Sequence, residues 1–139
     1  MDDKLFIVID FEVFCYAKGL ADDITFKLKA VADKWQNVDN LEYEDIAKLI
    51  YADNIDILVD LAGHTAHSLL PVFAYKPAPL QISGIGYFNT TGLKTVDYFL
   101  TDINCDPIGK NDEFFREWSC IFFEIRICSW AFFVLRDKF

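Results

Sequence analysis

The stretch Ile55-Asp56-Ile57-Leu58-Val59-Asp60-Leu61 decides the fold class. It is rich in β-branched residues and almost continuously apolar, which is typical of a strand buried on both faces of a parallel sheet. The residues that follow it, Gly63-His64-Thr65, predict a turn at the carboxyl end of this strand. The chain is therefore expected to contain a parallel sheet whose central strands end in polar loops.

The sequence on either side of this strand alternates between helical and strand patterns. Apolar spacings of three and four predict one helix over 24–32, capped by Asp22 or Asp23 and followed by Trp35, and a second around 46–50 that breaks at Asp53-Asn54. A third, over 66–75, should stop before Pro77. Further strands are predicted over 5–17 (one strand or a pair), 80–85 and 96–101, with a turn-rich loop over 86–92. Such alternation with short connections indicates an α/β fold with crossover helices.

The composition limits the function classes. The 139 residues suit one domain, but the hydrophobic fraction of 53% exceeds the roughly 45–50% of ordinary soluble domains. Two interpretations stay open: a surface that further sequence or a partner covers, or a poorly soluble chain. The net charge of −9 disfavours general binding to nucleic acid. Charges interrupt the apolar tail over 114–139 too often for a membrane span, and its alternation over 124–127 predicts a strand unless the end is scrambled.

The cysteines indicate a reducing compartment. Cys15, Cys105, Cys120 and Cys128 show no CxxC spacing, and the N-terminus is acidic where a signal peptide would be basic. We therefore expect free thiols and a cytoplasmic location, with no zinc site.

Polar residues at the predicted strand ends are the candidates for chemistry, because ligands of open parallel sheets bind there. His64 is either a general base or sugar ligand, or a tether for its loop. A metal site formed with His67 and Asp60 is disfavoured, because no further acid or thiol lies nearby. Three aspartates that follow strands or turns suit either acid–base chemistry or turn capping: Asp60, Asp97 and Asp102. In the loop over 86–92, Tyr87 and Phe88 either stack on a ligand or pack in the core.

Several stretches together resemble one known family. They are Phe11–Tyr16 with Asp23-Ile24-Thr25 and Ala32–Trp35, then Asp56–Thr65, Phe73–Ile82, Gly86–Leu93 and Asp97–Asp102. Their order and separation are similar to those of the family 41 glycosyltransferases, which comprise the protein O-GlcNAc transferases and the SPINDLY proteins. The resemblance runs from Phe11 to Glu113.

The resemblance implies a GT-B enzyme with two Rossmann-like lobes, of which residues 1–113 form part of the N-terminal lobe and 114–139 a divergent tail. It implies UDP-GlcNAc as co-substrate, Ser or Thr of an acceptor protein as target, and neither a metal nor another cofactor. It assigns no catalytic residue here, but it places a set of residues against the donor sugar: His64, Thr65, Ile85, Gly86, Tyr87, Asn89, Thr90 and Thr91.

The sequence departs from the family pattern in ways that bear on activity. Gly84 and Phe88 stand where the family usually has Trp and Pro. The family's upstream histidine-proline segment and its second lobe are not found in these residues. The expectation is therefore a transferase fragment that is inactive without the C-terminal lobe or a complementary chain, the alternative being a non-catalytic module that binds a sugar nucleotide or a protein.

Overall fold

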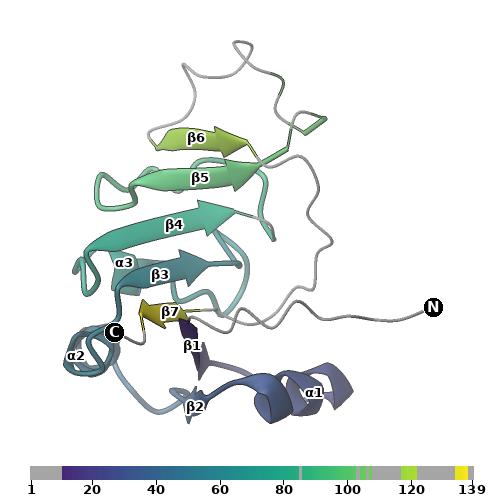
Figure 1. Cartoon of the computed structure of the whole chain (residues 1–139), viewed down its shortest axis with the longest axis vertical. Helices are drawn as coiled ribbons and strands as arrows, with labels where there is room; N and C mark the ends of the chain where they lie inside the picture. The colour runs from purple at the N-terminus through teal and green to yellow at the C-terminus, as the bar shows by residue number, and fades with distance from the viewer. Residues whose placement is uncertain are drawn as a thin grey trace.

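The computed structural model describes residues 11–84, 86–102, 104, 105, 107, 117–121 and 134–137. Strands and helices alternate along this part of the chain, as expected (Figure 1). The helices are α1 (Asp23–Val31), α2 (Tyr43–Ala52) and α3 (Leu70–Phe73). The strands are β1 (Phe11–Ala17), β2 (Lys34–Asn37), β3 (Ile57–Asp60), β4 (Leu80–Gly84), β5 (Tyr98–Thr101), β6 (Trp118–Ile121) and β7 (Val134–Asp137).

These strands form one sheet in the order β2-β1-β7-β3-β4-β5-β6. The pairs β1–β2, β3–β4, β4–β5 and β5–β6 are parallel, whereas β7 runs antiparallel to both of its neighbours. Figure 1 shows β7 between β3 and β1, pointing against β3. The expected α/β fold is confirmed, with an interior antiparallel strand that the sequence did not predict.

The two longer helices follow their sequence signals. Asp22 is the N-cap of α1: its carboxylate accepts from the backbone N–H of Thr25 at 2.8 Å, and the Thr25 hydroxyl accepts from the Asp22 N–H at 3.2 Å. This reciprocal capping box satisfies two donors that the first helical turn leaves free. α2 ends at Asp53, where the break was expected.

One strand was not predicted, and one helix was predicted too long. The residues around Trp35 form β2, which pairs in parallel with β1 through Cys15↔Trp35. This edge strand is short and polar, so it lacks an apolar pattern. The third helix is confined to α3, because His67 adopts a left-handed φ of 61° and the chain turns until Leu69. The strand predicted over 124–127 lies outside the described residues.

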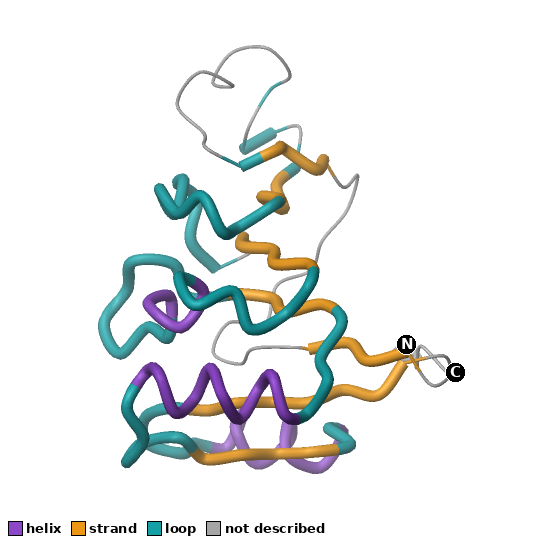
Figure 2. The backbone as a smooth tube through the Cα atoms, turned by 90° about the vertical axis from the view of Figure 1, so that its left-hand side faces the viewer, coloured by secondary structure: helices purple, strands orange, loops and turns teal. Residues whose placement is uncertain are grey.

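The core lies between the sheet and α2 with α3. It is a cluster of apolar side chains that includes Phe14, Tyr16, Ile46, Ile50, Leu58, Val72 and Phe73. α1 lies on the other side of the strands from α2 (Figure 2) and has no buried residue. Phe26 of α1 is 63% exposed, so part of the apolar excess of the composition lies on this helix.

A carboxylate ties α2 to the edge of the sheet. Asp53 accepts from the buried Tyr16 hydroxyl at 2.7 Å and pairs with the Lys34 ammonium at 2.5 Å. Burial raises the pKa of Asp53, but the bonds from Lys34 and Tyr16 outweigh it and hold the pKa below its usual value. No helix in the described part of the chain is long and apolar enough to span a membrane.

Candidate functional site

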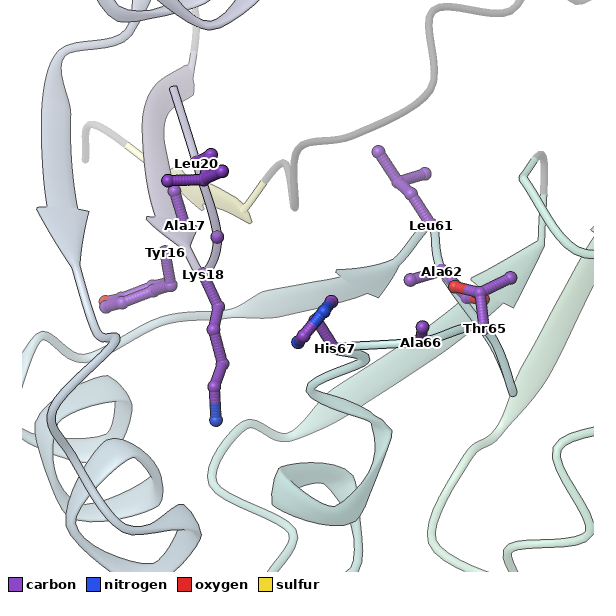
Figure 3. Close-up of a pocket in the computed structure, with 10 residues that line it drawn as sticks. Tyr16, Ala17, Lys18, Leu20, Leu61, Ala62, Thr65, Ala66 and His67 are labelled. Atoms are coloured by element: carbon purple, nitrogen blue, oxygen red, sulfur yellow. The ribbon is translucent and has the colours of Figure 1, made fainter. Parts of the chain in front are cut away.

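One crevice lies where the strand order reverses. The chain passes from β1 to its outer neighbour β2. From β3 it passes the other way, to β4. The loops that follow β1 and β3 therefore leave the sheet in opposite directions. A cavity of about 440 Å³ opens between them. Residues 16–20 at the end of β1 form one wall, and residues between Leu61 and His67 form the other (Figure 3). This position is the usual ligand site of an open α/β sheet.

A second cavity, of about 710 Å³, adjoins the first. Thr65 and His67 line both cavities, and His64 lines the second together with Tyr43 at the start of α2. Its far side is formed by α3 and by Thr91 and Leu93. The loop after β3 therefore separates two hollows and presents its polar side chains to both.

Asp60 sets the conformation of this loop. Its carboxylate is fully buried and accepts from the N–H of Ala62 at 3.0 Å, the N–H of Gly63 at 3.0 Å and the hydroxyl of Ser83 at 2.8 Å. Burial raises the pKa of Asp60, and these hydrogen bonds oppose the rise only in part. The turn-capping interpretation is thus confirmed for Asp60, because its oxygens accept hydrogen bonds from the loop that follows β3 and from Ser83.

The loops after β3 and β4 pack directly against each other. Gly63 has a φ of +52°, and a Cβ built there would lie 2.5 Å from the side chain of Tyr87. A Cβ on Gly86 would lie 1.8 Å from the carbonyl oxygen of Leu61. Glycine is therefore required at both positions, and the contact brings the rings of His64 and Tyr87 to 5.5 Å in an edge-on arrangement. These residues come from separate loops that contact each other, and His64 lines the second cavity.

The hydroxyls of the expected sugar loop are already engaged. Thr90 donates to one Glu117 oxygen at 2.7 Å, and both the hydroxyl and the N–H of Thr91 donate to the other. Burial raises the pKa of Glu117, but the bonds from Thr91 and Thr90 outweigh it and hold the pKa below its usual value. A ligand that used these hydroxyls would have to compete with a buried carboxylate.

The remaining predicted residues divide into two groups. His64 and Thr65 are exposed and line the second cavity, although the Thr65 hydroxyl also donates to the Ala62 carbonyl at 2.8 Å, and Asn89 is exposed. Gly86 and Tyr87 are partly buried and pack against the loop after β3. Phe88 is exposed, so the interpretation that places it in the core is wrong. Ile85 lies outside the described residues.

The other two aspartates serve the fold. Asp97 pairs with the Lys76 ammonium at 2.5 Å and accepts from the Gln81 N–H at 2.8 Å. Asp102 accepts from the N–H groups of Asn104 and Cys105, which lowers its pKa. Among the described residues, no group of three or more His, Cys, Asp or Glu side chains is arranged to hold a metal ion.

Sequence reasoning missed the cationic wall of the first cavity. Lys18 lines this cavity, and its ammonium lies 5.0 Å from the centre of the Tyr43 ring. Asp39 accepts from the N–H of Gly19 at 2.7 Å, which lowers its pKa and holds the loop after β1 in place. The position of Lys18 directly after an apolar run was the one available signal. Glu117 had none, because its partners lie 26 and 27 residues away.

Comparisons with known proteins find a matching family and several similar proteins. Residues 7–123 match the model of glycosyl transferase family 41. The probable UDP-N-acetylglucosamine–peptide N-acetylglucosaminyltransferase SPINDLY of Arabidopsis thaliana is 49% identical over 73 residues, which are 52% of this chain and 8% of that protein. The SPINDLY protein of Oryza sativa subsp. japonica is 42% identical over 92 residues, 65% of this chain and 10% of that protein.

A solved structure has a similar fold. A mutant of the O-GlcNAc transferase of Thermobaculum terrenum superposes with a TM-score of 0.75 at 37% identity, covering 79% of this chain and 21% of that one. The chain thus spans about a tenth of the length of the curated relatives given above.

Proposed function

Because the chain belongs to glycosyl transferase family 41, we propose that it forms part of the sugar-donor cleft of a protein O-linked N-acetylglucosamine transferase. Its Rossmann-like sheet corresponds to part of a GT-B lobe, as the structural likeness to an O-GlcNAc transferase confirms. The parent reaction would be transfer of GlcNAc from UDP-GlcNAc to Ser or Thr of a protein. The proposal includes no turnover by these 139 residues alone.

One observation carries the proposal: the contact that the loops after β3 and β4 make at the carboxyl edge of the sheet, beside the second cavity that His64 lines. Gly63 and Gly86 allow these loops to touch, and the contact places the His64 imidazole beside the Tyr87 ring. Sugars are bound by such combinations of aromatic faces, hydrogen-bonding side chains and closely approaching backbone. His64 would exchange hydrogen bonds with a sugar hydroxyl or a diphosphate oxygen.

The cysteines support a reducing compartment, for which we propose the cytoplasm. Cys15 is buried and free, and burial raises the pKa of its thiol to about 12. A thiol with such a pKa stays protonated and behaves as a small apolar group. Cys105 is free as well.

The test is thermal unfolding of the purified chain with UDP-GlcNAc, with UDP and without ligand, alongside a transfer assay. A ligand at a hundredfold excess over its Kd stabilises the native state by about 2.7 kcal/mol. We expect a higher Tm with UDP-GlcNAc, a smaller rise with UDP, loss of the difference in His64→Ala, and no transfer. An unchanged Tm in all conditions would contradict the proposal that this part of the cleft binds the sugar donor by itself.

Two other outcomes separate the alternatives. A Tm shift that persists when a chain carrying the second lobe is added, still without transfer, would favour a non-catalytic binding module. Transfer that appears only on that addition would support the proposed part in a complete cleft. Replacing Lys48, a surface residue of α2 that pairs with Glu44 at 2.7 Å, provides the control substitution away from both cavities.

A further inference from the structure

The interior position between β1 and β3, named the central position, is filled in an unusual way. Among the strands that the structure describes, β7 alone runs antiparallel, and it lies between β1 and β3 (Figure 1). Doubly wound sheets commonly carry an antiparallel strand at an edge, while their central strands are parallel. The crossovers on either side favour a strand parallel to β1 and β3 at this position, but β7 runs antiparallel to both.

The family match does not include this occupant. It ends at residue 123, whereas β7 begins at Val134. β1 and β3 lie inside the match, and each has one other neighbour already, β2 and β4 respectively. Unfilled, the position would leave two rows of backbone N–H and C=O groups without ladder partners inside the sheet. We therefore expect relatives that share β1 and β3 to fill the same position with another segment.

The order of the remaining strands indicates the direction of that segment. The usual doubly wound order is 3-2-1-4-5-6, with strand 1 parallel to both neighbours. Here β2, β1, the central position, β3, β4 and β5 follow one another in the same way. The position of β7 thus corresponds to the first strand of such a sheet.

We propose that the position between β1 and β3 is a strand-exchange site. β7 is its replaceable occupant, and the competing partner is an extended apolar segment of a family 41 lobe that runs parallel to β1. This inference rests on family membership and topology, and it is independent of donor binding. Backbone hydrogen bonds would supply the affinity, as in other cases of β-strand addition.

Exchange would also change the first cavity. A parallel strand ends at the same sheet edge as β1 and β3, so the residues that follow it would emerge between Lys18 and Leu61. These residues line the two walls of the 440 Å³ cavity. The residues after the incoming strand would add a third wall to this cavity. β7 runs in the opposite direction, so the residues that follow it leave at the other edge of the sheet.

The test is hydrogen exchange of the full chain mixed with overlapping peptides that tile the part of the Arabidopsis SPINDLY protein preceding its matched segment. We expect one peptide to bind, the amides of 134–137 to lose protection, and those of 11–17 and 57–60 to keep it. Arg136→Pro removes a backbone N–H from β7, so the peptide should bind about tenfold more tightly to this variant. Arg136→Ala keeps the N–H and is the matched control.

Each other result is decisive as well. If Arg136→Pro unfolds the chain, recovery of the far-ultraviolet circular dichroism signal on adding the peptide supports exchange, and no recovery overturns it. A peptide that binds while 134–137 stays protected, or equal affinity for the two Arg136 variants, also overturns it. Attachment of a spin label at one peptide end distinguishes parallel from antiparallel insertion, and antiparallel insertion would contradict the proposed partner.

Discussion

Replacing Asp60 by alanine should destabilise the chain more than any surface substitution. The carboxylate is 0% exposed and accepts from Ala62 N–H, Gly63 N–H and the Ser83 hydroxyl at 2.8–3.0 Å. Alanine removes the acceptor and leaves the three donors in place. The loop that carries His64 then loses the bonds that define its turn.

The magnitude follows from the number of donors left unsatisfied. A buried donor without a partner costs about 1–3 kcal/mol. Gly63 N–H and Ser83 are buried, and Ala62 is partly buried, so water can reach part of the site. The buried charge that is removed had its own desolvation cost, which reduces the net effect. We expect a loss of about 4 kcal/mol, close to the upper range for single substitutions.

The assay is urea unfolding of Asp60→Ala and Ser83→Ala, followed by circular dichroism, with the free energy of unfolding taken from the midpoint and slope. Ser83→Ala deletes one donor together with its bond, and should cost about 1 kcal/mol. If Asp60→Ala costs less than about 1 kcal/mol, or no more than Ser83→Ala, the carboxylate does not hold the loop as argued.

The same residue predicts a pH dependence. Because burial raises the pKa of Asp60 in the folded state, its contribution to stability is fully present below the unfolded pKa of about 3.9 and is lost as pH rises through the folded value. Asn resembles the neutral acid, so Asp60→Asn should become more stable relative to the unmodified chain as pH rises. Urea midpoints of both proteins at a series of pH values check this sign. A difference that does not vary with pH would contradict the raised pKa.

Two further perturbations test the loop after β4. Gly86→Ala forces a Cβ to 1.8 Å from the Leu61 carbonyl oxygen and should lower the free energy of unfolding by about 3 kcal/mol or more. The control Gly92→Ala, at φ +72° with no atom within 4 Å, should lower it by only about 1–2 kcal/mol. Equal Tm values for the two variants would refute the close packing. Glu117→Gln should cost about 1–2 kcal/mol at neutral pH by weakening the bonds from Thr91. Because the pKa of Glu117 is lowered, its contribution to stability is present above the unfolded pKa of about 4.3 and is lost as pH falls. The stability lost in Glu117→Gln should therefore shrink in acid. A loss that stays constant in melting curves across this pH range would contradict the lowered pKa.

The sequence by itself determined the features that depend on neighbouring residues. The apolar run over 55–61 indicates a strand buried on both faces, and the start of α1 was predicted at Asp22 or Asp23, of which the structure selects Asp22. The alternation of such elements then leaves few arrangements besides a parallel sheet with crossover helices. The family resemblance and the general location of the site could be recognised from the same local patterns.

Only the tertiary structure decided the features that join distant parts of the chain. Ser83 reaches Asp60 across 23 residues, and Glu117 reaches Thr91 across 26. β7 enters the sheet beside a strand that begins at Phe11. Local periodicity indicates which face of a helix or strand is buried. It does not indicate which distant carboxylate, hydroxyl or strand edge will contact that face. That choice depends on the closure of long loops and on satisfying every buried polar group at once, and both are properties of the whole fold.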